Sequence, residues 1–344
     1  MRLRRVDVST PGFTRRRRGR GFGYHAADGN PITDPEVVDR IRALAIPPAW
    51  TDVWICPRPN GHIQAVGTDA AGRRQYLYHD QWRVLRDGLK YDRVLRLATR
   101  LPRLRRAVAA DLARPGLGRE RVLAAALRML DLAVFRTGND EYAPQGDDEE
   151  GTFGLTTLRC SHVRVRRGVV SVAYTGKGGI EHSVVLTDPD LHRIVIALRR
   201  GRSPEAELLG YRTPEGWRDV RAYDLNARIK ELAGDEFTAK DLRTWSATVL
   251  AAVSLAAACA SGMPSSRRAR QRAVVAAMRE VAEHLGNTPT VARKSYVDPR
   301  VIECFERGIT VPLAQQRAGP GDLADAVVRE RLERAVLRML RAAS

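Results

Sequence analysis

The spacing of hydrophobic residues changes near residue 90, and this change restricts the fold more than any other feature of the chain. From about residue 21 to 90 there are short β-rich runs separated by turn residues, with a short helix expected over Pro35 to Leu44. Asn60-Gly61 lies between two of these runs, which is typical of a β-hairpin. From about residue 91 the hydrophobic residues repeat with helical spacing. The sequence therefore predicts an α+β protein in which a small β-rich N-terminal domain precedes a larger, mainly helical domain.

The helical part is interrupted once, over residues 157–186, by β patterning. Turn residues at Arg167-Gly168 and Lys177-Gly178-Gly179 divide this stretch into three runs, so we expect a short three-stranded antiparallel sheet. Helices are predicted before and after this stretch of the sequence, over residues 91–114, 119–136, 188–200, 224–233, 239–260, 266–285 and 322–343.

These patterns suggest four consecutive regions. Residues 1–20 contain the arginine run Arg15 to Arg18 and are expected to form a basic, flexible arm. Residues 21–90 form the β-rich N-terminal domain and residues 91–310 the helical domain. Residues 311–344 contain the linker AGPG and a final amphipathic helix.

The charge of the chain indicates its partner. Of the 344 residues 44% are apolar, which is ample for a buried core, yet the net charge is +18. An extended polyanion such as nucleic acid is the expected partner, although charge alone also fits a protein that binds nucleic acid without specificity. The longest apolar run, Ala247 to Ala260, is too short to span a bilayer and is interpreted as a buried helix. No membrane partner and no signal peptide are expected, and the predicted location is the cytoplasm, in association with the nucleoid.

Neither a metal nor another cofactor is expected from the sequence. The four cysteines are far apart in the chain and lack the spacing of a zinc finger, so we expect reduced thiols: Cys56, Cys160, Cys259 and Cys304. Gly176-Lys177 is followed by glycine and lacks the upstream glycine of a phosphate-binding loop, so no nucleotide is implied.

Two C-terminal segments carry the chemistry. Residues 285–300, LGNTPTVARKSYVDPR, present Tyr296 behind Asn287 and a basic pair. Residues 238–245, TAKDLRTW, place Lys240 and Arg243 in the first turns of a helix that Thr238 is expected to cap. A phenol close to several cations favours attack on a phosphodiester by a tyrosine nucleophile.

Together with other segments in the same order, these residues resemble the type IB DNA topoisomerases, specifically the poxvirus-like and bacterial branch. The other segments are IRALAIPPAW (41–50), GRRQYLYHDQW (72–82), FRTGNDEY (135–142) followed by GTFGLTTLR, and TGKGG (175–179). The resemblance extends from about Gly12 to about Gly308.

The resemblance implies five catalytic residues. Tyr296 would be the nucleophile, Arg136 and Arg243 would neutralise the phosphate, and Lys177 would be the general acid toward the departing 5′-oxygen. From its sequence context alone, Lys177 is an ordinary hairpin tip. Asn287 would hold a nonbridging phosphate oxygen. The poxvirus pattern has histidine at this place, and asparagine keeps a hydrogen-bond donor but cannot carry charge, so no proton-transfer role is expected for it.

Six further residues match positions that contact DNA in that family. Gln75, Tyr76 and Tyr78 would reach the major groove, and strand alternation puts both tyrosines on one face. A half-buried strand residue is an equally good interpretation of Tyr78. The positions expected to approach DNA phosphates are Tyr142, Lys240 and Thr290.

The implied function is relaxation of supercoiled duplex DNA by a monomer that clamps around it. The enzyme, an isomerase, would cut one strand through a 3′-phosphotyrosyl intermediate, allow rotation and reseal the strand without ATP or metal. One alternative is a tyrosine recombinase, but recombinases usually have histidine where Lys240 stands and lack the IPPAW and QYLY segments. The other is a non-catalytic basic DNA-binding protein, which would explain the charge but not the surroundings of Tyr296.

Overall fold

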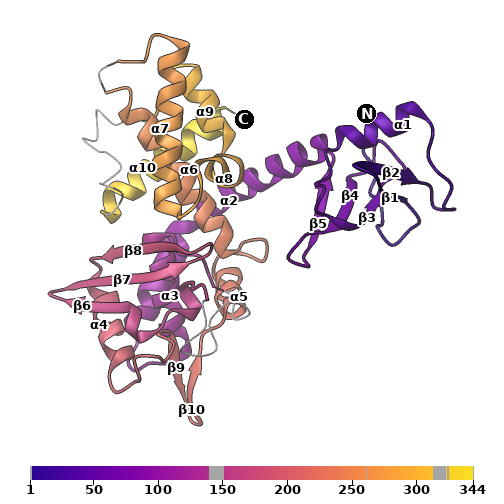
Figure 1. Ribbon diagram of the computed structural model, residues 1–344. Coiled ribbons are helices and arrows are strands. Elements are labelled where there is room, and N and C mark those ends of the chain that lie inside the picture. The colour runs from indigo at the N-terminus through magenta and orange to yellow at the C-terminus, as the bar shows by residue number, and fades with distance from the viewer. Residues whose placement is uncertain (1, 139–150, 261, 313–322, 324, 344) are drawn as a thin grey trace. The chain divides into compact units, whose positions relative to one another are not determined.

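A computed structural model of the protein describes residues 2–138, 151–260, 262–312, 323 and 325–343 (Figure 1). The chain divides into two compact units, Met1–Tyr91 and Asp92–Ser344. Each unit has its own hydrophobic core, so each is described by itself. The predicted α+β class is confirmed.

The N-terminal unit is built on a five-stranded antiparallel sheet with the strand order β2-β1-β3-β4-β5. Helix α1 (Pro35–Ala43) packs on one face, where Ile41 meets Ile55 and Ala65. The carboxylate of Asp34 caps this helix by accepting a hydrogen bond from the Glu36 N–H at 2.9 Å. The strands are β1 (Phe13–Arg18), β2 (Gly21–His25), β3 (Thr51–Ile55), β4 (Ile63–Thr68) and β5 (Arg74–Tyr78).

The hairpin predicted at Asn60-Gly61 is confirmed. Strands β3 and β4 pair antiparallel, and residues 56–62 connect them. A Cβ atom at Gly61 would lie 2.5 Å from the sulfur of Cys56, so only glycine fits this turn.

The arginine run differs from its prediction, because residues 13–18 form strand β1 rather than a flexible arm. Phe13 packs against the core of this unit. The Arg15 guanidinium donates hydrogen bonds to the carbonyl oxygens of Ile46, Pro47 and Trp50 at 3.1, 3.0 and 2.6 Å. The high charge of the segment predicted a solvated chain. In the structure three backbone carbonyl groups replace water as hydrogen-bond partners of Arg15, and β1 pairs with a strand on each side.

The sheet also has a face turned away from α1, which we call the open face. Strand alternation puts Arg16 and Arg18 of β1 opposite to Phe13 and Arg15, and both are exposed. Arg74, Tyr76 and Tyr78 of β5 alternate in the same way with Leu77, which packs on the core. The open face is defined by Arg16, Arg18, Arg74, Tyr76 and Tyr78.

Helix α2 (Asp80–Leu112) begins earlier than the predicted residue 91. The hydrophobic residues in its first turns, Val84, Leu85 and Leu89, are exposed, so this part of the helix has no buried hydrophobic face. Helical periodicity depends on such a face, and the sequence signal therefore appears only where burial starts, at Tyr91.

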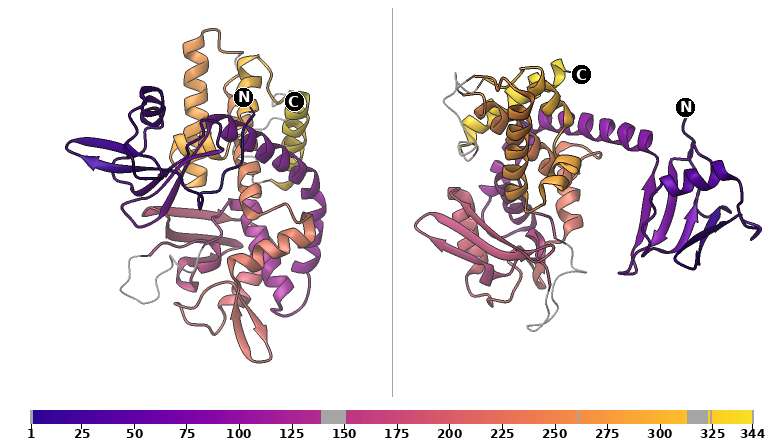
Figure 2. Two further views of the ribbon diagram at one scale, coloured as in Figure 1. Left: turned by 90° about the vertical axis from the view of Figure 1, so that its right-hand side faces the viewer. Right: turned by 45° about the horizontal axis from the view of Figure 1, so that its top comes forward.

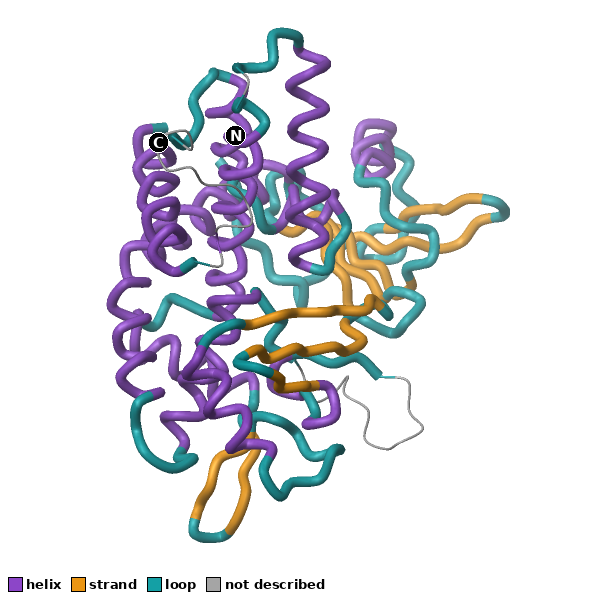
Figure 3. Tube along the Cα trace, turned by 90° about the vertical axis from the view of Figure 1, so that its left-hand side faces the viewer, coloured by secondary structure: helices purple, strands orange, loops and turns teal. Residues whose placement is uncertain are grey.

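The larger unit contains the predicted three-stranded antiparallel sheet, with the order β6-β7-β8 (Figure 3). Helices α3 and α4 pack against it. The hairpin β9–β10 and the short helices α8 and α9 were not predicted. The elements are α3 (Arg119–Ala133), β6 (Val163–Arg166), β7 (Val169–Gly176), β8 (Ile180–Leu186), α4 (Pro189–Arg199), β9 (Gly210–Thr213), β10 (Gly216–Asp219), α5 (Ala222–Ala233), α6 (Ala239–Ala257), α7 (Arg267–Leu285), α8 (Pro289–Ser295), α9 (Pro299–Glu306) and α10 (Ala326–Ala342).

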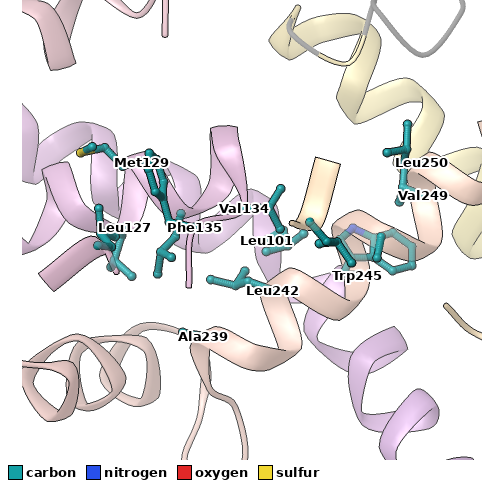
Figure 4. Close-up of a cluster of buried hydrophobic side chains, with 14 of the residues drawn as sticks. Leu101, Leu127, Met129, Val134, Phe135, Ala239, Leu242, Trp245, Val249 and Leu250 are labelled. Atoms are coloured by element: carbon teal, nitrogen blue, oxygen red, sulfur yellow. The ribbon is translucent and has the colours of Figure 1, made fainter. Parts of the chain in front are cut away.

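Helix α6 is the centre of this unit. The apolar run predicted to be a buried helix forms most of it, and its side chains join those of α2 and α3 in one core, including Leu101, Leu127, Leu242 and Trp245 (Figure 4). Helices α7, α9 and α10 pack on α6, and Figure 2 shows this group of helices from two further sides. Among the described helices, none combines the length and apolar character needed to cross a membrane.

A buried ionic cluster attaches α10 to this core, and we call it the Asp131 network. Arg105 donates to both carboxylate oxygens of Asp131 at 2.8 and 2.9 Å and to Glu333 at 2.6 and 2.8 Å. Arg329 lies 3.2 Å from the Asp131 carboxylate. Burial raises the pKa of Asp131, but Arg105 and Arg329 outweigh it and hold that pKa below its usual value.

Candidate functional site

The site begins at the N-terminus of α6, which is fixed as its capping pattern predicted. The Asp241 carboxylate accepts hydrogen bonds from the N–H and the hydroxyl of Thr238, both at 2.9 Å. Arg93 donates to the same carboxylate at 2.8 Å. This start of the helix leaves Lys240 exposed and turns Arg243 into the protein.

Arg243 is held by backbone oxygens. It is 5% exposed, and its two terminal nitrogens donate to the carbonyl oxygens of Val134 and Leu285. Val134 ends α3 in the left-handed conformation, at φ 54°, which a β-branched residue rarely adopts. Burial lowers the pKa of Arg243, while Tyr296 acts in the opposite direction. The guanidinium is therefore preorganised in a site with little water.

Tyr296 is placed beside Arg243. It directly follows α8, and its ring centroid lies 5.4 Å from the guanidinium carbon of Arg243. Its backbone is held by Thr248 of α6, whose hydroxyl lies 3.3 Å from the Tyr296 carbonyl oxygen and accepts from the Asp298 N–H at 3.2 Å. One helix thus positions both the cation and the phenol.

Arg136 and Asn287 form a second pair at the site. A terminal nitrogen of Arg136 donates to the Asn287 side-chain oxygen and to the Gly286 carbonyl at 3.3 Å. Arg136 was predicted in a helix over 119–136, but α3 ends at Ala133 because Val134 leaves the helical conformation. Arg136 therefore lies on the irregular segment after the helix and faces the loop that follows α7.

Three buried nitrogens at this place have no hydrogen-bond partner within the described part of the chain. They are Nε of Arg136, Nε of Arg243 and Nδ2 of Asn287. Buried donors are nearly always satisfied in folded proteins, and leaving one unsatisfied costs about 1–3 kcal/mol. Three such donors, one of them on the arginine beside the Tyr296 ring, fit a ligand rich in acceptor oxygens and negative charge.

Lys177 occupies the tip of the β7–β8 hairpin. The lysine is exposed, and Gly178 and Gly179 adopt φ values of +82° and +72°, which form the tight turn after it. In the described part of the chain Lys177 makes no hydrogen bond or ion pair. The structure therefore shows two contacting pairs, Arg243 with Tyr296 and Arg136 with Asn287. Both arginines donate to backbone oxygens of the same short segment, Arg243 to Leu285 and Arg136 to Gly286.

A second tyrosine, Tyr174, also lies near the arginines. It is 5% exposed, and burial raises its pKa to about 12 against the opposing effect of Arg243 and Arg136. A phenol that is covered and hard to ionise is poorly suited to attack a large substrate. Tyr296 is only partly buried, so it is the better nucleophile candidate.

The predicted DNA contacts lie on different surfaces. Tyr76 and Tyr78 are 38% and 39% exposed and stack with their ring centroids 6.1 Å apart. Gln75 alternates to the opposite face of β5 and donates to Asp69 at 2.9 Å. Lys240 and Thr290 are exposed in the larger unit, and Tyr142 lies outside the described residues.

Thr248 and Tyr174 have positions at the site that the sequence interpretation did not assign. A threonine within a long apolar run was a usable signal for Thr248, because a buried hydroxyl needs partners. No local pattern distinguishes Tyr174 from any other strand residue.

Comparisons with known proteins identify the family of the chain. Residues 79–311 match the model of the catalytic core of eukaryotic DNA topoisomerase I. Residues 21–69 match the model of the N-terminal domain of bacterial DNA topoisomerase IB. The chain belongs to the type IB DNA topoisomerase family.

Viral relatives of this topoisomerase match over most of their length. DNA topoisomerase 1B of Acanthamoeba polyphaga mimivirus is 30% identical over 298 residues, which cover 86% of this chain and 88% of the relative. DNA topoisomerase 1B of Vaccinia virus (strain Copenhagen) is 24% identical, covering 80% and 84%. The site-specific recombinase XerH bound to its difH substrate has a TM-score of 0.37 at 15% identity, covering 61% of this chain and 52% of that one, a likeness too weak to bear on function.

Proposed function

We propose that this topoisomerase cuts one strand of duplex DNA with Tyr296 as the nucleophile. The phenolic oxygen attacks the phosphorus, the bond from phosphorus to the 5′-oxygen breaks, and a 3′-phosphotyrosyl bond and a 5′-hydroxyl result. The free end rotates and releases torsion. The 5′-oxygen then attacks the phosphorus, breaks the bond to Tyr296 and restores the strand. The covalent bond conserves the energy of the phosphodiester, so these steps require neither ATP nor a metal ion.

The observation that carries this proposal is the set of three unpartnered donors, on Arg243 beside Tyr296 and on the contacting pair Arg136 and Asn287. In the transition state the attacking oxygen, the leaving oxygen and the phosphoryl group concentrate negative charge. Nε of Arg136 and Nε of Arg243 would donate to phosphate oxygens with charge-assisted bonds, and Nδ2 of Asn287 would add a neutral one. Guanidinium groups suit this role because their planar donors match the geometry of phosphate oxygens.

Lys177 is the proposed general acid. Once the bond to phosphorus breaks, the 5′-oxygen needs a proton, and the ammonium of Lys177 would provide it. The lysine is exposed on a glycine-rich turn, so it is accessible to a substrate that covers the site. The proton that Tyr296 loses would pass to solvent. During resealing the neutral amine of Lys177 would take the proton of the 5′-hydroxyl back, and the departing phenolate of Tyr296 would regain a proton from solvent.

Duplex DNA is the proposed partner of both units. On the N-terminal unit the open face offers exposed arginines and two stacked tyrosines, which suit phosphates and base edges. Gln75 would have to exchange its bond to Asp69 for a base contact. On the larger unit Lys240, Thr290 and Tyr142 would approach phosphates. We propose a monomer that clamps around the duplex, needs no nucleotide, and acts in the cytoplasm on the nucleoid.

Trapping the covalent intermediate tests this function. The protein is mixed with supercoiled plasmid, with chelator and without nucleotide, then denatured, and the peptide bound to DNA is sequenced. Relaxed plasmid and an adduct at Tyr296 are expected. A relaxed plasmid with the adduct on another residue would overturn the assignment of Tyr296. Unchanged linking number would favour a non-catalytic DNA-binding protein, and failure to relax any plasmid that lacks a specific recombination site would favour a recombinase.

A further inference from the structure

We infer that His182 is a positioning residue that docks the Lys177 hairpin onto the loop carrying Asn287. The inference rests on the proposed role of Lys177 as general acid. His182 belongs to β8, five residues after Lys177, and pairs with Tyr174 across the hairpin. It has no part in the chemical steps described above.

The imidazole fills a space left by two glycines. A Cβ atom on Gly176, the residue before Lys177, would lie 2.5 Å from the His182 ring. A Cβ atom on Gly286, the residue before Asn287, would lie 1.9 Å from the same ring. Real side-chain carbons do not approach so closely, so the ring is in contact with both backbones. His182 therefore links the base of the hairpin turn to the loop whose Asn287 side chain meets Arg136.

Aromatic stacking fixes the orientation of this imidazole. The ring lies 5.0 Å from Tyr174, centroid to centroid, with an angle of 10° between the planes. Tyr174 in turn stacks on Phe135, at 5.9 Å, and Phe135 precedes Arg136 in the chain. The stack thus extends from the general-acid hairpin to the segment that carries a phosphate-binding arginine.

The chemistry of the surroundings favours contact rather than charge as the role of His182. Burial lowers the pKa of this imidazole, and the nearby guanidinium groups of Arg243 and Arg136 lower it further, against the weaker opposite effect of Glu181. A neutral ring can pack between glycine backbones without adding a cation to an already cationic site. The docking of Lys177 then depends on the shape of the ring.

Removing the ring should release the hairpin tip. The Gly178-Gly179 turn after Lys177 has little conformational restraint of its own, because glycine adopts many backbone conformations. A small displacement of a catalytic group costs up to about 100-fold in rate. We expect His182→Ala to slow single-turnover cleavage by roughly 10- to 100-fold through misplacement of Lys177.

The test compares two DNA substrates, one ordinary and one with sulfur in place of the bridging 5′-oxygen. The sulfur leaves without a proton, so a defect in acid catalysis disappears with this substrate. Single-turnover cleavage is measured for the full-length protein and its Lys177→Ala, His182→Ala and Arg243→Ala variants. We expect the sulfur substrate to restore Lys177→Ala and His182→Ala, and not Arg243→Ala.

A second variant guards against simple loss of folding. Gly176→Ala keeps every side chain but places a methyl group where the ring of His182 lies, so it should slow cleavage of the ordinary substrate. In the His182→Ala background the same change should add no further loss, because the ring it would displace is gone. His162→Ala is the matched control: this imidazole packs on Phe153 with ring centroids 4.4 Å apart, and its removal should not produce a defect that sulfur restores.

The outcomes separate the inference from the proposed function. If sulfur restores Lys177→Ala but not His182→Ala, His182 does not position the acid, while Lys177 keeps its role. Cleavage of the ordinary substrate by His182→Ala at the unaltered rate would overturn the inference equally. If sulfur fails to restore Lys177→Ala, the acid is misassigned, and both proposals fall together.

Discussion

The arginines of the two units differ in their environment, because Arg243 of the larger unit is buried and those on the open face of the N-terminal unit are exposed. In the larger unit Arg243 is 5% exposed, bound to two backbone carbonyls and next to Tyr296. On the open face of the N-terminal sheet Arg16 and Arg18 of strand β1 are exposed. A buried, fixed guanidinium acts on one charge at one place, whereas exposed ones attract any phosphate nearby. A single substitution of a buried arginine at the site should therefore abolish or greatly slow DNA cleavage, whereas each substitution of an exposed arginine should lower DNA affinity only slightly.

Strand β1 contains the same contrast in two consecutive residues. Arg15 points to the core side and donates to three carbonyl oxygens, while Arg16 alternates to the open face. Charge and sequence context are nearly identical for the two. The direction of each side chain decides whether an arginine supports the fold or the substrate.

The largest expected effect is the loss of all cleavage in Tyr296→Phe, because only the phenolic oxygen can form the covalent bond. DNA affinity should remain, since binding is distributed over many cations. The measurements are plasmid relaxation, adduct formation and equilibrium binding. Tyr174→Phe is the informative comparison, because this second phenol also lies near both arginines. Tyr174→Phe should still form the adduct. If Tyr296→Phe still relaxed plasmid, the nucleophile would have to be another residue.

Arg243→Ala should have the second largest effect. Single-turnover cleavage should be slowed by about 10²–10³-fold, the usual effect of removing one charge-stabilising donor. Arg243→Lys should recover little, because an ammonium cannot donate to two carbonyls and a phosphate in the same plane. DNA affinity should change much less than rate. A large loss of affinity with an unchanged cleavage rate at saturation would mean that Arg243 binds DNA in the ground state only.

Arg15→Ala should destabilise the N-terminal unit by about 2 kcal/mol, the order expected for hydrogen bonds made by a charged donor. Denaturant unfolding measures this effect. Arg16→Ala, its neighbour on the same strand, is the control and should leave the unfolding midpoint unchanged. Equal midpoints for the two variants would mean that the carbonyl contacts of Arg15 contribute nothing to stability.

The smallest effect is expected for Arg16→Ala on DNA binding. Loss of one phosphate contact should make the slope of log affinity against log salt shallower by about 0.9. Arg42→Ala is a suitable control, since this arginine lies on α1, pairs with Asp39 at 3.3 Å and is not part of the open face. A slope that does not change in Arg16→Ala would remove the open face from the DNA interface.

The sequence predicted most helices and strands because these depend on local signals, whereas the proposed site residues were assigned from the family resemblance and stay a prediction. The capping pair Thr238 and Asp241, the turn glycines after Lys177 and the apolar run of α6 each determine structure within a few residues. Strand β1 was missed because its stability comes from carbonyls some thirty positions away, at Ile46 to Trp50. The start of α2 was missed because its first turns have no buried face.

The relation between His182 and its two glycines could not be predicted for the same reason. Gly176 is six residues from His182 along the chain, but Gly286 is more than a hundred residues away. Contacts of this kind depend on shape complementarity between distant backbones. The roles proposed for Tyr296, Arg243 and Arg136 come from motifs in the sequence, whereas the contacts of His182 with the two glycines are visible only in three dimensions.

The Asp131 network has a consequence for how the protein is made. Arg105 and Glu333 are separated by 228 positions, and Asp131 and Arg329 by 198. During synthesis Arg105 and Asp131 leave the ribosome long before the final helix α10 does. The cluster can therefore form completely only after the last residues of the chain have been made. A chain that terminates before α10 would bury Arg105 and Asp131 with part of their partners missing, which is strongly destabilising. Premature termination late in the message should therefore yield a product that cellular proteases remove, even though every proposed catalytic residue is present.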